Sequence, residues 1–179
     1  RGPGPKRCSM TIHDVRNPEA AGPSPEALRA TLASFATGVV VVTTLDPAGR
    51  PFGMTINSFN AVSLAPPLVL WSLALKAQSV PIWRDARGFA INILAEDQGD
   101  LCRRFSSPIE DRFEGVDWTG GLDGLPILPG AVATLQCRFW QRYPGGDHEI
   151  MLGQVLACTH APQTPLVYCQ GRLGGLRVA

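Results

Sequence analysis

The stretch that decides the fold is GMTINSFNAVSLAPPLVLWSL, residues 53–73. Its first part alternates between apolar and polar side chains, with Met54 and Ile56 on one parity and Thr55 and Asn57 on the other. This period of two is typical of a β-strand that buries one face. The sequence therefore predicts a strand at the start of this stretch.

The remainder of the stretch predicts two further strands. Residues 59–64 are apolar on both parities, as in a strand that is covered on both faces. Pro66-Pro67 ends that strand, and another begins at residues 68–73. The whole stretch thus predicts three strands of an extended sheet.

Polar residues interrupt the apolar pattern between the first two of these strands. Thr55, Asn57 and Ser58 supply hydroxyls, an amide and free backbone N–H groups without adding charge. Such donors can hold a phosphate or the polar edge of a planar heterocycle. Two ordinary strands joined by a polar turn would explain the same residues, and chemistry alone does not decide between the two.

The composition bounds the class of protein. A chain of 179 residues with 45% hydrophobic residues is long enough for one domain with a full core. No apolar run approaches the roughly 20 residues of a membrane span, and a net charge of +1 argues against binding of nucleic acid. The five cysteines form no C-x-x-C motif and no metal-binding cluster, which fits reduced thiols in the cytoplasm. We therefore expect a cytoplasmic protein without a metal site.

The N-terminal part predicts a tail followed by one domain. Residues 1–23 are rich in Pro and Gly, and we expect a disordered or extended tail there, with the domain over residues 24–179. Ser24 is a good N-cap for a helix, with proline in its first turn, and Gly38 suits the helix end. An apolar stripe on this helix is formed by Leu28, Leu32 and Phe35.

The rest of the chain predicts a mainly β architecture. Asp46 to Gly49 is a turn that joins a β-branched strand to the central stretch as a hairpin, and residues 144–146 form a second turn. Several strands at short spacing, with few helices, indicate a β-barrel with peripheral helices. Further strands are predicted at residues 39–45, 89–94, 131–143, 150–158 and 166–169, and helices at residues 80–87 (closed by Gly88) and 96–105.

The sequence resembles the flavin reductase-like family. The pieces that carry the resemblance are SFATGVVVVTTLDPAGRP (residues 34–51), the central stretch, and GGDHEIMLGQV (residues 145–155), in the family's order and spacing. The resemblance covers the chain from about Leu28 to Leu176. It implies a mainly β fold, the Greek-key-like FMN-binding split β-barrel with a few peripheral helices.

The resemblance also implies an activity and partners. Members of this family are NAD(P)H:flavin oxidoreductases, and many supply reduced flavin by diffusion to a flavin-dependent monooxygenase. We therefore expect FMN or FAD as the flavin and NADH or NADPH as the co-substrate. We also expect a homodimer, because the apolar strand residues exceed what one small barrel can bury and the family places its flavin near a two-fold interface.

The resemblance places a flavin site around the polar residues of the central stretch. It puts the turn at Ser72–Ala74 and the residue Ser79 beside the ribityl phosphate, with Lys76 or Arg104 as a countercharge and the Phe105 ring against the isoalloxazine. The expected flavin-binding residues are Thr37, Met54, Thr55, Ile56, Asn57, Ser58, Ser72, Leu73, Ala74, Lys76, Ser79, Arg104 and Phe105.

Several of these residues also have a purely structural explanation. Thr37 can be a helix-end residue, Ser79 a helix N-cap, and Lys76 a solvated lysine. Phe105 can be a core residue beside a surface Arg104. The sequence leaves both explanations open for each of them.

The motif Gly146-Asp147-His148 matches the family at the nicotinamide side of the flavin. The resemblance implies that His148 positions the nicotinamide, whereas a lone histidine beside a turn is otherwise a solvated residue. Relatives often carry an aromatic residue at the position of Leu173, so the stacking contact of that aromatic is not expected in this chain.

The absence of other catalytic motifs agrees with cofactor chemistry. No nucleophile with a paired base is evident in the sequence, and no G-x-G-x-x-G motif opens a helix. In a flavin reductase the cofactors carry the reaction and the protein orients them. Two alternatives remain: a split-barrel flavin-binding electron-transfer protein without NAD(P)H turnover, and a pyridoxamine-phosphate-oxidase-like enzyme, which is disfavoured because the motifs match the reductase branch.

Overall fold

The computed structural model describes residues 22–176, so residues 1–21 of the predicted tail lie outside the described residues. No helix in residues 22–176 is long and apolar enough to cross a membrane. The strands are β1 (Thr37–Gly38), β2 (Val40–Leu45), β3 (Pro51–Ile56), β4 (Asn60–Leu64), β5 (Pro67–Ala74), β6 (Gly88–Ile93), β7 (Thr119–Gly120), β8 (Pro126–Ile127), β9 (Ala133–Gly145), β10 (His148–His160), β11 (Leu166–Cys169) and β12 (Arg172–Gly175). The helices are α1 (Pro25–Leu32), α2 (Val80–Asp85) and α3 (Gly99–Ser106), with short 3-10 turns η1 (Glu96–Gln98) and η2 (Leu122–Gly124).

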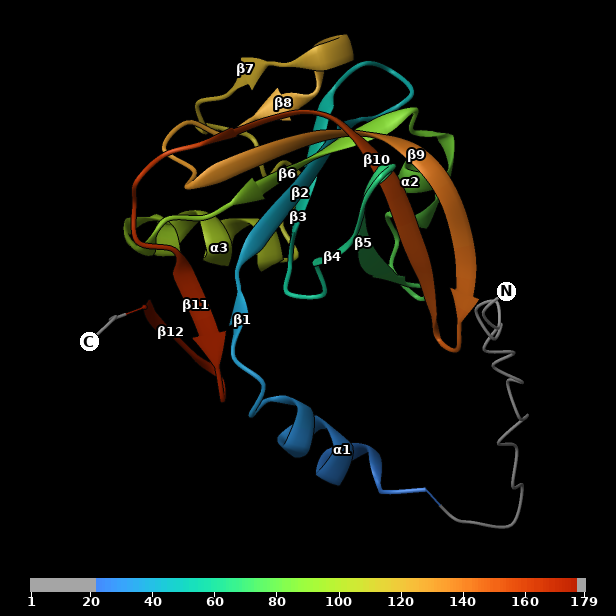
Figure 1. Ribbon diagram of the computed structural model, residues 1–179, viewed down its shortest axis with the longest axis vertical. Coiled ribbons are helices and arrows are strands. Elements are labelled where there is room, and N and C mark those ends of the chain that lie inside the picture. The colour runs from blue at the N-terminus through green and yellow to red at the C-terminus, as the bar shows by residue number, and fades with distance from the viewer. Residues whose placement is uncertain (1–21, 177–179) are drawn as a thin grey trace, which may run out of the picture.

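One curled sheet of seven strands forms the body of the molecule (Figure 1). Its strands follow the order β3-β2-β6-β9-β10-β5-β4, and every neighbouring pair is antiparallel. The two edge strands, β3 and β4, follow each other in the chain but do not pair with each other. The barrel is therefore split between β3 and β4, which confirms the predicted split-barrel class.

Two smaller sheets accompany the barrel. β1, β11 and β12 form a three-stranded sheet, which lies below the barrel in Figure 1, and β7 pairs with β8. Helix α1 extends away from the barrel, and its end is tied to the β11–β12 turn by a bond from Gln170 N to Ala33 O. The three-stranded sheet brings the C-terminal part of the chain beside the start of β2.

Strand β2 separates two apolar cores. Val40 and Val42 face the barrel core, whereas Val39 and Val41 face a second core beneath α3. In the barrel core the Trp71 ring packs edge-on against Trp83, at a centroid distance of 4.8 Å. Burial on both faces explains why this segment is β-branched throughout and confirms the buried strand predicted there.

Strand β4 differs from its prediction. Its apolar residues are exposed instead of covered on both faces: Val62 is 48% exposed and Leu64 is 96% exposed. β4 is an edge strand that pairs only with β5, so no element of residues 22–176 covers it. The prediction of a doubly covered strand is therefore wrong for the single chain.

Three predicted element ends are also corrected. Ser24 caps α1 as expected, accepting a bond from Ala27 N, but the helix ends at Leu32 and not at Gly38, which belongs to β1. α2 ends at Asp85, and Gly88 instead begins β6, where an added Cβ would lie 2.5 Å from the Cys137 carbonyl oxygen. Likewise β9 continues to Gly145, inside the predicted turn at residues 144–146, and only Gly146 and Asp147 lie between β9 and β10.

Candidate functional site

A cavity of about 410 Å³ opens where β3 ends. Strand β3, helix α3 and the β11–β12 hairpin form its walls. This volume lies in the range of roughly 300–1,000 Å³ that small-molecule sites occupy. The lining residues are Val39, Thr55, Ile56, Asn57, Cys102, Arg103, Ser106, Tyr168, Gly171 and Leu173.

The alternation of β3 supplies the polar wall of this cavity. Met54 and Ile56 pack on the barrel core, so Thr55 and Asn57 project from the opposite face. The Thr55 hydroxyl donates to the Cys102 carbonyl oxygen at 2.8 Å and thereby fixes α3 against β3. The Asn57 side chain is exposed and makes no hydrogen bond within residues 22–176, so its amide is available to a ligand.

Ser58 links β3 to a second group of predicted residues. Its hydroxyl oxygen accepts a bond from Ser72 N at 3.0 Å, which ties the start of the β3–β4 connection to β5. At the end of β5, Ala74 lies opposite His148, and Leu75 N donates to the Asp147 carbonyl oxygen. The structure therefore brings the Ser72–Ala74 segment and the His148 motif together.

The β9–β10 turn carries a hydrogen-bonded pair. His148 Nδ1 lies 2.7 Å from a carboxylate oxygen of Asp147. This bond and the charge of His148, aided by the charge of Lys76, lower the pKa of Asp147. Asp147 therefore remains a carboxylate that orients the His148 ring, and Lys76 lies close enough to act on the same pair.

Thr37 lies beside the cavity with an unused polar atom. It pairs with Tyr168 across β1 and β11, and Tyr168 lines the cavity. The Thr37 hydroxyl oxygen is buried and has no hydrogen-bond partner among the described residues. Because buried hydroxyls are almost always bonded, this atom fits a site that a polar ligand completes.

Some of the predicted site residues lie elsewhere. The Phe105 ring is fully buried and packs edge-on against Phe113 at 5.0 Å, so it belongs to the second core and does not face the cavity. The Arg104 guanidinium is occupied by the backbone carbonyls of Arg112 and Glu114. The Leu73 side chain is fully buried in the barrel core.

Ser79 also differs from its prediction. It stands at the first position before α2, but its side chain makes no capping bond. Its hydroxyl instead lies 4.0 Å from the Met54 sulfur, on the barrel side of β3. With only six residues in α2, neither the cap nor an anion site at this helix end is supported.

Other residues of α3 than the predicted Arg104 and Phe105 line the cavity, and Tyr168 of β11 lines it without having been predicted. Cys102 and Ser106 are four residues apart and therefore share a helix face, a spacing that could have indicated them. Arg103 lies between them and is the charged residue of the lining. Burial raises the pKa of the Cys102 thiol, which stays neutral. No sequence pattern around Tyr168 indicated that it would line the cavity, because only the pairing of β1 with β11 brings it there.

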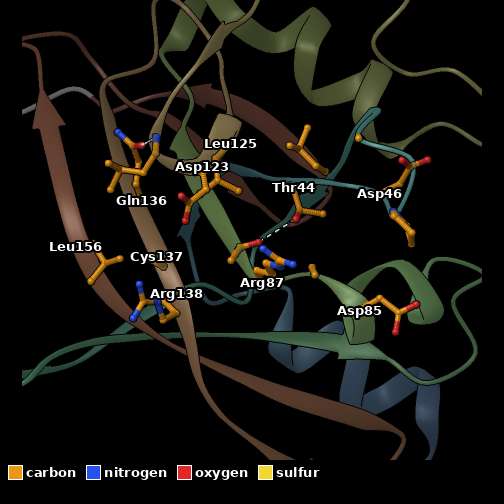
Figure 2. Close-up of a pocket in the computed structure, with 16 residues that line it drawn as sticks. Thr44, Asp46, Asp85, Arg87, Asp123, Leu125, Gln136, Cys137, Arg138 and Leu156 are labelled. Carbon is orange, nitrogen blue, oxygen red and sulfur yellow. Dashed lines mark hydrogen bonds between the residues drawn. The ribbon is translucent and has the colours of Figure 1, made fainter.

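A larger cavity, of about 760 Å³, lies at the other end of the β2–β3 hairpin (Figure 2). It includes none of the predicted flavin residues and has no aromatic residue in its lining. The two cavities share no lining residue. Of these two cavities, only the smaller one has an aromatic residue, Tyr168, in its lining.

Comparison with known proteins gives a consistent family match. The family described as flavin reductase like domain matches residues 32–177. A probable flavin reductase of Rhizobium meliloti is 43% identical over 160 residues, 87% of this chain and 51% of the relative. An FMN reductase (NADH) of Agrobacterium fabrum is 41% identical over 153 residues, 86% of this chain and 87% of the relative.

A solved structure matches equally well. The NADH:FAD oxidoreductase of Streptomyces globisporus, in complex with NAD and FAD fragments, is 38% identical with a TM-score of 0.81, covering 90% of this chain and 97% of that one. Other relatives are named as reductase subunits or components of flavin-dependent monooxygenases. The chain spans about half the length of the Rhizobium meliloti relative described above, and 64% of a second relative from that organism.

Proposed function

This chain belongs to the flavin reductase-like domain family, and from that premise we propose that it is an NAD(P)H:flavin oxidoreductase that supplies reduced flavin to a partner monooxygenase. The observation that carries the proposal is the cavity at the end of β3, where neutral donors, an aromatic ring and one arginine converge. Relatives named as FMN reductase (NADH) and as monooxygenase reductase subunits support the same activity.

The cavity residues fit a flavin. Asn57 offers a free amide for the polar edge of the ring. Thr37 does not line the cavity, but it pairs with the lining residue Tyr168, and its buried hydroxyl has no partner among the described residues. Tyr168 supplies an aromatic surface opposite Leu173, where the expected aromatic is absent. Thr55 and Ser58 hold the walls in place through their bonds to α3 and β5.

Two cations remain available for phosphate groups. Arg103 lines the cavity, whereas the guanidinium of the predicted Arg104 is occupied by a loop, so we assign this role to Arg103. Arg103 contacts Asp100 at the surface and can exchange that carboxylate for a phosphate oxygen. Lys76 does not line the cavity, but it lies near enough to the Asp147–His148 pair for its charge to act on Asp147.

His148 is proposed to position the nicotinamide. Flavin and nicotinamide, when bound, would supply the hydride-transfer chemistry themselves, and the protein would orient them. With Asp147 held at Nδ1, the Nε2 atom of His148 is left to contact the co-substrate. His148 thus orients the nicotinamide or its phosphates, and the hydride step requires no proton from it.

A homodimer is proposed as the working form. The exposed apolar residues of β4 are an unprotected sheet edge, which proteins normally cover. Helix α1 has an apolar stripe but buries no residue, although an eight-residue helix is marginal without packing. A second copy that covers β4 and α1 would supply both missing contacts. Light scattering that returned the mass of one chain, 19.2 kDa, at micromolar concentration would exclude it.

A cytoplasmic location is proposed with this activity. The reaction consumes a reduced nicotinamide, and the four described cysteines are free thiols, as in a reducing compartment. The partner monooxygenase is proposed to receive reduced flavin by diffusion.

Steady-state oxidation of the nicotinamide tests the activity. The rate is measured with NADH and with NADPH, each with added FMN or FAD. Turnover that saturates with free flavin supports a reductase. Comparison of the four combinations of nicotinamide and flavin identifies the preferred nicotinamide and the preferred flavin. A protein that retains flavin tightly but oxidises neither nicotinamide would be an electron-transfer flavoprotein, and the proposal would be wrong.

A further inference from the structure

On the basis of the proposed function, we propose that Arg112 is a positioning residue of the flavin site. It fixes the orientation of α3 against β3 and thereby directs Arg103 to the phosphate of the flavin. Arg112 does not line the smaller cavity itself. It lies in residues 107–114, the segment after α3, which we call the strap.

Arg112 connects the end of α3 to β3. Its Nε donates to the Ser107 carbonyl oxygen at 3.0 Å, and its Nη1 donates to the Gly53 carbonyl oxygen, also at 3.0 Å. The guanidinium carbon lies 5.9 Å from the centroid of the Phe52 ring, within the range of a cation–π contact. The rigid fork of an arginine holds two acceptors at a fixed separation, which the single ammonium group of a lysine does not.

A second arginine fastens the strap to α3. Arg104 Nε donates to the Arg112 carbonyl oxygen at 2.8 Å, and Arg104 Nη2 donates to the Glu114 carbonyl oxygen. Between these two carbonyl groups, the Phe113 ring packs edge-on against Phe105 at 5.0 Å. The backbone of the strap is therefore held in place, and Arg112 extends from a fixed position.

The cavity residues of α3 lie between two attachments to β3. The Thr55 hydroxyl donates to the Cys102 carbonyl oxygen, and Arg112 binds the carbonyl oxygen of Ser107. Arg103 and Ser106, which both line the cavity, lie between these two carbonyl groups in the chain. A helix held at one point can pivot, whereas a helix held at two points cannot.

Apolar packing alone does not fix this orientation. Phe105 packs so closely on β3 that a Cβ added to Gly53 would lie 3.0 Å from its ring. Such a contact sets the distance between α3 and β3, but hydrophobic contact has no direction, so it leaves rotation of the helix less restricted. The hydrogen bonds of Arg112 are directional and restrict that rotation.

Arg112→Ala tests this role in fluorescence titrations of the full chain with FMN and with riboflavin. The dissociation constant for FMN should rise about tenfold, the usual effect of losing a charge-assisted bond to a phosphate. Riboflavin has no phosphate, so its dissociation constant should change by less than about threefold. In kinetics, the KM for FMN should rise while kcat at saturating FMN is retained. The control is Arg50→Ala, which removes a bond to Asp46 in the β2–β3 turn and should change none of these values.

Two further measurements separate positioning from a general loss of structure. Guanidinium chloride at low millimolar concentration should restore part of the FMN affinity of Arg112→Ala, because the free cation can replace the missing group, whereas sodium chloride should not. Arg112→Lys keeps one of the two bonds, so its FMN affinity should lie between those of Arg112→Ala and the unmodified chain.

The outcomes distinguish this role from the proposed function. If the unmodified chain binds no flavin, the proposed function is wrong. If it binds FMN but Arg112→Ala binds FMN as tightly, or weakens FMN and riboflavin equally without rescue by guanidinium, the positioning role of Arg112 is wrong. An FMN-selective loss that guanidinium partly reverses supports it.

Discussion

Substitution of Asn57 by alanine gives the sharpest test of the flavin site. Asn57 lies at the end of β3, and its amide makes no hydrogen bond to the protein within the described residues. Truncation therefore removes contacts to a ligand without leaving a protein group unpaired. We expect the free energy of unfolding of the flavin-free protein to change by less than about 0.5 kcal/mol, as is usual at exposed positions.

The effect on flavin affinity follows from the number of bonds that the amide can make. Two neutral hydrogen bonds, each with a net value of about 0.5–1.5 kcal/mol, give a loss of about 1–3 kcal/mol. This loss corresponds to a dissociation constant raised by roughly 5- to 150-fold. The dissociation constants for FMN and FAD are measured by fluorescence titration.

Asn60→Ala provides a matched control. Asn60 is also exposed, but it lies on β4 and does not line the cavity. We expect flavin affinity to remain unchanged in this variant. If Asn57→Ala binds flavin as tightly as the unmodified chain, Asn57 does not belong to the site and the cavity assignment loses its main donor.

Three further outcomes are expected. His148→Ala should raise the KM for the nicotinamide, or lower kcat/KM, with flavin affinity nearly intact. His160→Ala, at the far end of β10, is the control and should behave as the unmodified enzyme. Identical kinetics for the two variants would make His148 a solvated turn residue. Tyr168→Leu should weaken flavin binding severalfold in the same titration and Tyr168→Phe should preserve it, since the ring and not the hydroxyl supplies the stacking; equal losses in both variants would contradict stacking. Gly153→Ala should lower the free energy of unfolding, measured by urea denaturation, by about 1–3 kcal/mol, because the added Cβ would overlap the fully buried ring of Phe89. An unchanged urea midpoint would show that the barrel core accommodates the extra methyl group.

The sequence predicted strands well where burial and pattern agree. β2 is apolar on both parities because a core lies on each of its faces, so its pattern and its environment match. β4 has a similar pattern, yet its faces are exposed in the single chain. An apolar pattern indicates that a surface is buried, but it does not show whether the same chain or a second copy buries it. For this reason the pattern of β4 is as much an argument for a dimer as for a buried strand.

The ends of the elements were harder to predict because glycine is favoured both at helix ends and at crowded strand positions. Gly38 and Gly88 were expected to end helices, and both instead belong to strands. At Gly88 the reason is the close approach of the β9 backbone, which leaves no space for a side chain. A helix stop and a crowded strand position both favour glycine, and a sequence without tertiary contacts does not separate them.

The residues predicted on β3 lie at a cavity, but several of the residues predicted around them do not line it. Arg103, Arg104 and Phe105 are consecutive on α3, and about 100° of helix rotation separates each from the next. That rotation turns Phe105 into the core, leaves Arg104 to the loop carbonyls and directs Arg103 to the cavity. These three adjacent residues thus have different surroundings. The orientation of the helix therefore decides which of the two arginines faces the cavity.

The orientation of α3 is itself set by a residue of the predicted stretch. The Thr55 hydroxyl fixes the Cys102 carbonyl, one residue before Arg103. If the cavity binds flavin as we propose, we expect Thr55 to act on it in two ways, through its own oxygen and through the position of Arg103. Thr55→Val should misplace Arg103 and weaken a phosphate-bearing flavin more than riboflavin, whereas Thr55→Ser keeps the bond and should preserve both affinities. If Thr55→Val weakens the binding of FMN and of riboflavin equally, Thr55 has no effect at the phosphate end and contacts only the ring.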